Sequence, residues 1–150
     1  GANGKESAQR SLDEAIAAKG YARFVRKLYE DNFLDGHDPN LSGPIIASAM
    51  ALPEQVCRSL FHSMIAYDAE QLVPALRGCA VPVLALQSTV FGPERVRRPL
   101  GQGDASPYLD FVRANCPHAQ TEIIAGVGHF AQLEAPHEVN ARIDAFLAAL

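Results

Sequence analysis

The segment Val81–Gln87, with the sequence VPVLALQ, is almost continuously apolar. An unbroken apolar run of this length is typical of a parallel strand that is covered on both faces. Pro82 fits at the start of such a strand, because proline donates no hydrogen bond to a neighbouring strand. The short run Thr121–Ala125 also predicts a strand. The two runs together predict part of a parallel sheet, and therefore an α/β fold.

Apolar residues at helical spacing accompany these strands. Tyr108 to Val112 predict a helix that ends before Pro117, and Pro136 predicts the start of a last helix. Between the first strand and the first of these helices, residues 88–107 show no periodicity. A structureless connection of that length is usually functional or disordered. The order strand, long loop, helix, strand, helix predicts half of a doubly wound sheet.

The first half of the chain predicts helices alone. Ser11 to Glu14 fit a capping box, which would start a helix ending near Lys19. Further helices are predicted from Tyr21 to Asn32, from Pro44 to Met50, and in the region from Pro53 to Arg77. The apolar faces of these helices fit either ordinary helix packing, which we favour, or the lining of an apolar cleft.

The charge pattern argues against binding to nucleic acid. The chain of 150 residues has 13 Lys and Arg against 17 Asp and Glu, a net charge of −4, without the basic clustering that nucleic-acid surfaces need. One short basic cluster occurs, Arg95 with Arg97 and Arg98. We favour a solvated loop for this cluster over a site for an anionic ligand. No run long enough to span a membrane and no signal peptide is visible, so we expect a cytoplasmic protein without membrane contact.

Cysteine and histidine spacing predicts neither a disulfide nor a metal site. The three cysteines form no CxxC pair, and we expect reduced thiols: Cys57, Cys79 and Cys116. Four histidines lack any metal-binding spacing such as HExxH: His37, His62, His118 and His137. We therefore expect no metal and no cofactor.

The fifth histidine, His129, follows the second predicted strand. Gly126 and Gly128 allow a sharp turn just ahead of it. Ligands in α/β folds bind past the carboxyl ends of parallel strands, which is where this loop would lie. A histidine with a pKa near neutrality can act there as a general base. Without further context, a structural or surface histidine would be the better interpretation.

The context is the segment from Gly128 to Leu147, GHFAQLEAPHEVNARIDAFL. It resembles a GHxxxxExPxxVNxxIxxFL pattern at the C-terminus of α/β-hydrolases. The resemblance implies that His129 is the catalytic base. It also implies that residues 1–78 form a helical cap, or lid, and that residues 79–150 form the C-terminal part of the core. The chain would then be the C-terminal half of an α/β-hydrolase fold, with an incomplete set of parallel strands.

The other parts of a catalytic triad are not evident. No serine, cysteine or aspartate has the flanking glycines of a G-x-S-x-G elbow, and no HGGG-type oxyanion segment occurs. In the family both lie upstream of the cap. The acid often follows the seventh strand, where the first carboxylate here is Glu94, with Asp104 and Asp110 further on. Glu94 is a possible triad acid; alternatively the acid follows the sixth strand and is missing here, or the protein works without one.

The resemblance therefore implies a hydrolase of an ester, lactone or related small-molecule acyl substrate. His129 would take a proton from a serine that this chain does not contain, so we expect the chain alone to be inactive. Its partner would be the N-terminal half of the same protein or a second copy of the chain. The alternative is a non-catalytic remnant or interaction module that retains the fold.

Overall fold

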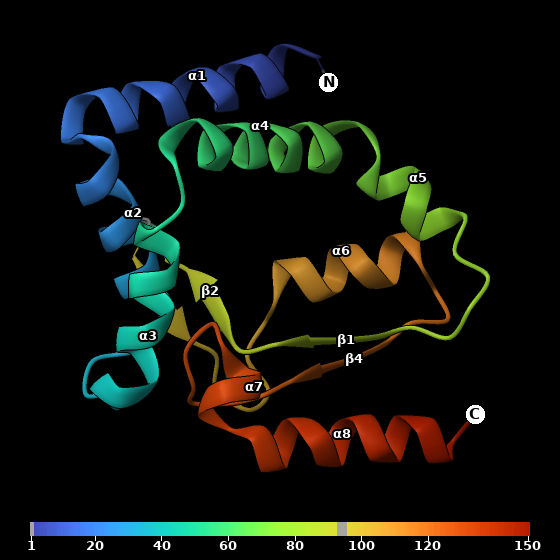
Figure 1. Ribbon diagram of the computed structural model, residues 1–150. Helices are drawn as coiled ribbons and strands as arrows, with labels where there is room; N and C mark the ends of the chain where they lie inside the picture. Colours follow the sequence, from blue (N-terminus) through green and yellow to red (C-terminus); the bar gives the residue numbers. More distant parts are fainter. Residues whose placement is uncertain (1, 93–95) are drawn as a thin grey trace. The chain divides into compact units, whose positions relative to one another are not determined.

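The structure, a computed structural model, describes residues 2–92 and 96–150 (Figure 1). It combines helices with short strands and divides into two compact units. Unit 1 comprises Gly1–Glu30 and Ser42–Gly78, and unit 2 comprises Asp31–Leu41 and Cys79–Leu150. Each unit has its own buried residues and is described by itself below.

Helices form the described part of unit 1: α1 (Ala2–Lys19), α2 (Tyr21–Glu30), most of α3 (Pro39–Met50), α4 (Glu54–Glu70) and α5 (Leu72–Arg77). Gly20, at a φ of 79°, separates α1 from α2. A small core gathers around the buried side chains of Val25, Ala49 and Cys57. The rings of Phe24 and Phe61 meet edge to face beside this core, with their centroids 6.3 Å apart. The prediction of helices throughout this region is confirmed.

The predicted start of α1 is wrong. The helix begins at Ala2, so Ser11 lies inside it and is not a cap. The preceding residues include good helix formers, which carry the helix through the capping sequence. Contacts with α4 also hold the early turns, because Lys5 forms an ion pair with Glu70 and the Gln9 amide donates to the carbonyl of His62 at 3.1 Å. Tertiary contacts thus outweigh the local signal.

One face of α4 packs poorly within unit 1. On the side toward α1, Asp13 accepts hydrogen bonds from Arg58 at 2.7 Å and from His62 at 3.1 Å. Another set of α4 side chains, spaced at helical intervals, is exposed: Val56, Leu60, Met64 and Tyr67. We call these four residues the α4 stripe. Leu60 and Met64 are 58% and 54% exposed. The favoured assignment of the apolar helix faces to ordinary packing is therefore wrong for the α4 stripe, whereas it is confirmed for residues such as Phe24 and Phe61, which pack against the core.

The described part of unit 2 contains four strands: β1 (Leu84–Gln87), β2 (Thr89–Phe91), β3 (Arg97–Pro99) and β4 (Gln120–Ile123). Strands β1 and β4 are parallel, with Leu84 opposite Gln120 and Gln87 opposite Ile123. The expected parallel pair is therefore confirmed. The helices of this unit are α6 (Pro107–Asn115), α7 (Ala131–Glu134) and α8 (Pro136–Ala148). Figure 1 shows α6 on one face of the β1–β4 pair and α8 on the other.

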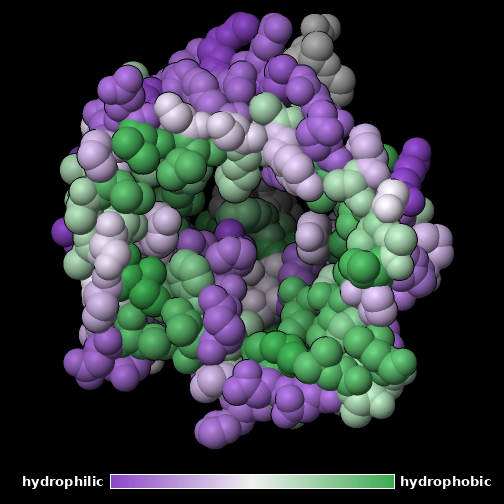
Figure 2. Space-filling view, turned by 45° about the vertical axis from the view of Figure 1, so that its right-hand side comes forward, coloured by the Kyte–Doolittle hydropathy of each residue, from purple (hydrophilic) through white to green (hydrophobic). Residues whose placement is uncertain are grey.

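The first strand is shorter and more open than its sequence predicts. It begins at Leu84, and Val81 is 64% exposed. All four residues of β1 are only half-buried, which differs from the expected cover on both faces. Apolar side chains are also exposed on α8, at Ile143 and Leu147, and just after it, at Leu150. Figure 2 shows exposed hydrophobic surface in its lower part, at the level of this helix and the sheet.

The predicted loop at residues 88–107 is not structureless. Strands β2 and β3 pair antiparallel within it, with Thr89 opposite Pro99 and Phe91 opposite Arg97. Three-residue strands are too short to give a visible alternation, which explains why the sequence did not reveal them. Glu94, the possible triad acid, lies outside the described residues.

The core of unit 2 lies between these elements. Its buried apolar residues are Phe33, Leu100, Leu109, Val112, Cys116, Ile124 and Val139. Ser106 caps α6 by accepting a hydrogen bond from the backbone N–H of Leu109 at 3.2 Å. Across residues 2–92 and 96–150, no helix combines the length and apolar character needed to cross a membrane.

Candidate functional site

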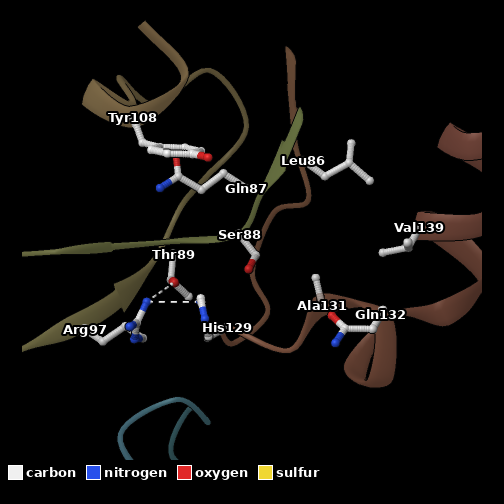
Figure 3. Close-up of a pocket in the computed structure, with 10 residues that line it drawn as sticks. All are labelled: Leu86, Gln87, Ser88, Thr89, Arg97, Tyr108, His129, Ala131, Gln132 and Val139. Carbon is white, nitrogen blue, oxygen red and sulfur yellow. Dashed lines mark hydrogen bonds between the residues drawn. The ribbon is translucent and has the colours of Figure 1, made fainter. Parts of the chain in front are cut away.

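A pocket of about 410 Å³ opens in unit 2 past the carboxyl ends of β1 and β4. Ser88 and Thr89 come directly after β1, and His129 lies in the loop after β4. Figure 3 shows the ten lining residues: Leu86, Gln87, Ser88, Thr89, Arg97, Tyr108, His129, Ala131, Gln132 and Val139. The parallel strands thus bring the predicted histidine to a pocket at the edge of the sheet where ligands bind in α/β folds.

The backbone of the loop that carries His129 is held at three points. Gly126, at a φ of 76°, donates its N–H to the carbonyl of Leu100 at 2.9 Å. The N–H of Gly128 donates to the Glu134 carboxylate at 3.0 Å. The N–H of His129 donates to the carbonyl of Asn32 at 2.7 Å. These bonds fix the position from which the His129 side chain enters the pocket.

Leu100 joins the two strand ends. It is fully buried, and its N–H donates to the carbonyl of Ser88 at 2.8 Å while its own carbonyl accepts from Gly126. The Ser88 hydroxyl adds a direct link by donating to the carbonyl of Gly128 at 2.6 Å. Ser88 is only 4% exposed, so its hydroxyl serves this link and is poorly placed to act as a nucleophile.

The His129 ring accepts a hydrogen bond from a cation. Its Nδ1 lies 3.3 Å from Nη1 of Arg97, as Figure 3 shows. A guanidinium can only donate, so the neutral ring carries its proton on Nε2. Partial burial, and then the charge of Arg97, lower the pKa of His129 below its usual value. The ring is therefore neutral at pH 7, with a donor at Nε2.

Arg97 itself is held between several groups of the pocket. Its Nη1 also donates to the hydroxyl of Thr89 at 2.8 Å, and its Cζ lies 4.4 Å from the centre of the Phe91 ring. Its Nε is buried and finds no hydrogen-bond partner within the described part of the chain. Burial lowers the pKa of Arg97, and the charge of Asp31 partly opposes that change.

The candidate acids do not reach this histidine in the described residues. Asp104 accepts hydrogen bonds from the N–H of Gly101 at 2.9 Å and from Arg98 at 3.3 Å. These bonds, first the one from Gly101, lower the pKa of Asp104. Asp110 forms an ion pair with Arg113. In a Ser-His-Asp triad, a carboxylate would accept from Nδ1, the atom that Arg97 contacts here. No cluster of three metal-ligating side chains occurs in the searched residues 2–92 and 96–150.

Sequence reasoning located His129 but missed the residues that surround it. Arg97 appeared only as part of a short basic cluster, and the hairpin register that turns it toward the pocket was not visible. Glu134 belongs to the hydrolase-like pattern, yet nothing in the sequence indicates that its carboxylate accepts a hydrogen bond from the Gly128 N–H. Asn32 was assigned to a helix, whereas it lies after α2 and accepts from the His129 N–H.

Comparisons of the chain with family models, curated proteins and solved structures give no match. Its function is therefore proposed from the geometry and chemistry of the pocket.

Proposed function

We propose that this chain supplies the histidine of an α/β-hydrolase active site that acts on an ester, lactone or related acyl substrate. The observation that carries the proposal is the position of His129. It follows a parallel strand at the carboxyl edge of the sheet and lines a pocket of about 410 Å³. Catalytic and ligand-binding groups of α/β folds gather at this edge.

In the proposed reaction, His129 takes a proton from a nucleophile and later activates water to release the acyl group. The lowered pKa of His129 favours this role, because only a neutral imidazole can accept a proton. The present tautomer carries its proton on Nε2. For Nε2 to act as the base, that proton must move to Nδ1, and Arg97 must release Nδ1 first.

The nucleophile would come from polypeptide outside this sequence, either an N-terminal half of the same protein or another copy. Two buried polar atoms without partners in the described structure border the His129 loop, Arg97 Nε and Glu134 Oε1. A buried polar atom left unpaired costs about 1–3 kcal/mol. Further polar groups that complete the site would offset this cost. On this proposal the chain alone is inactive.

The contact between Arg97 and His129 favours a second candidate function. A guanidinium occupies the place where a triad would put a carboxylate. A protein that has lost the reaction, and keeps the pocket as a non-catalytic interaction module, would tolerate this arrangement. The two candidates differ in whether any nucleophile is activated beside His129.

The first prediction tests His129 in the native assembly of the protein. We expect His129→Gln to lower the hydrolysis of p-nitrophenyl esters by about 10³-fold or more, because the members of a triad act as a unit. His137→Gln is the matched control, since His137 is exposed at the start of α8 and outside the pocket lining. A fluorophosphonate probe should label one serine of the assembly. Ester turnover that survives His129→Gln would contradict the role of His129 as the base. An assembly that neither turns over esters nor takes the label would favour the second candidate.

A further inference from the structure

We propose that the pocket binds a small organic anion, a carboxylate on an apolar body, with Arg97 as its counter-ion. The statement that this anion is the substrate rests on the proposed function. The binding site itself is independent of turnover. It would serve a hydrolase whose acyl substrate carries a free carboxylate, and equally a module that only binds such a molecule.

The charge of the pocket points to an anion. Among the described residues that line it, Arg97 is present and neither an aspartate nor a glutamate occurs. Among the described residues Arg97 forms no ion pair with a carboxylate, and Asp31 acts on it only through its charge. Removing a guanidinium from water without pairing it is unfavourable. A ligand carboxylate beside Arg97 would offset that cost and could accept charge-assisted hydrogen bonds from it.

The two sides of the pocket differ in character. Figure 3 shows Arg97 and Thr89 on one side, and the apolar side chains of Leu86 and Val139 on the other. His129 lies near the cationic side and offers its Nε2 proton as a further donor while Arg97 occupies Nδ1. A ligand with its carboxylate toward Arg97 and its apolar part toward Leu86 matches both sides.

Binding of the anion would also change the state of the base. Nη1 of Arg97 carries two protons, which it donates to Thr89 and to Nδ1 of His129. A carboxylate that accepts a hydrogen bond through the second proton draws Arg97 away from Nδ1. The ring proton can then move from Nε2 to Nδ1. Nε2 becomes an acceptor, as general-base catalysis requires. The anion at Arg97 would thus convert His129 from a donor into a base.

The test compares an acid with its neutral analogue on the protein in its native assembly. Phenylacetate and phenylacetamide have nearly the same shape, and only the former is charged. We expect phenylacetate to bind at least tenfold more tightly by calorimetry. We expect Arg97→Gln to reduce this preference to less than threefold. Shifts of the His129 ring signals in NMR spectra should locate the bound acid in the pocket.

Arg98→Gln is the matched control. Arg98 is the next residue of β3, is exposed, contacts Asp104 and does not line the pocket. The control variant should keep the tenfold preference, and backbone NMR spectra of both variants should show an intact fold. Arg97→Lys should keep part of the preference, since it retains the charge without the planar geometry.

The proposal would be overturned by wild-type protein that binds the acid and the amide equally well, or that binds neither. An Arg97→Gln protein that keeps the preference while folded would overturn it too. These outcomes are separate from a failure of the hydrolase proposal. Preferential binding of phenylacetate without ester turnover would support the anion site and contradict the hydrolase proposal.

Discussion

Gly128 has less room around its Cα than a side chain needs. A Cβ at this position would lie 2.4 Å from one Glu134 carboxylate oxygen and 2.7 Å from the carbonyl of Asn32. The Glu134 side chain can move, but the Asn32 carbonyl belongs to the backbone and accepts the N–H of His129. The absence of a side chain at Gly128 therefore lets the loop approach Asn32 closely enough to hold His129.

The second prediction concerns Gly128→Ala. We expect the free energy of unfolding to fall by about 1–3 kcal/mol, because the new methyl group must push the Asn32 carbonyl aside. Gly4→Ala is the control, since Gly4 lies within α1 with open space around it. There alanine should be neutral or stabilise the helix by up to about 1 kcal/mol. Urea unfolding of both variants measures their free energies of unfolding. Equal values would show that the close approach of Gly128 to Asn32 does not affect stability.

The third prediction is that His129 titrates below 6.5, the ordinary value for histidine, because burial and Arg97 both lower its pKa. The folded state then binds fewer protons than the unfolded state just below pH 6.5. The stability that the folded state gains with His129 neutral is therefore present above pH 6.5 and is lost as the pH falls below 6.5. Arg97→Gln should raise the pKa of His129, because it removes the nearby positive charge. NMR titration of the histidine ring protons measures it, and a wild-type value at or above 6.5 would contradict the assignment.

At the scale of the elements, the β2–β3 hairpin determines which arginine enters the pocket. Successive residues of a strand point to opposite faces. Arg97, opposite Phe91, contacts Thr89 and His129, whereas Arg98 contacts Asp104. A shift of the register by one residue would exchange the two side chains. The pairing of Thr89 with Pro99 therefore matters to the chemistry of the site as well as to the fold.

The sequence predicted the elements with long or uniform signals. The apolar runs around Leu84 and Glu122 identified the parallel strands, and the glycines before His129 placed that residue at the carboxyl edge of the sheet. The partners of His129 could not be predicted in the same way. The contact with Arg97 depends on the register of a hairpin with three-residue strands, and the bond to Asn32 joins residues far apart in the chain. Such contacts leave no local period in the sequence.

At the scale of the whole molecule, three surfaces lack partners in the described structure. Strands β1 and β4 pair only with each other there, so the outer edges of this two-stranded sheet have no neighbouring strand. The α4 stripe is exposed as well, and Leu147 of α8 and Leu150 just after that helix are 57% and 70% exposed. Open strand edges and exposed apolar patches both promote association with other polypeptides.

The fourth prediction is that the chain does not persist as a free monomer. We expect native light scattering to give a mass above the 16.1 kDa of the chain. Denaturing mass spectrometry then tells whether the partner is a separate polypeptide, such as an N-terminal half, or a second copy. Substituting Leu60 and Met64 by glutamine should weaken the association if the α4 stripe takes part, whereas Arg26→Gln, at an exposed position of α2, should not. A stable, monodisperse particle of 16.1 kDa would contradict the prediction.

The two hydrogen bonds of Leu100 also limit how the pocket can move. Its N–H holds the end of β1 at Ser88, and its carbonyl holds the turn after β4 at Gly126. A fluctuation that displaces Leu100 breaks both of its bonds and leaves the Ser88–Gly128 and Asn32–His129 bonds to hold the site. The two walls of the pocket are therefore coupled through one residue, and a local opening at Leu100 loosens both.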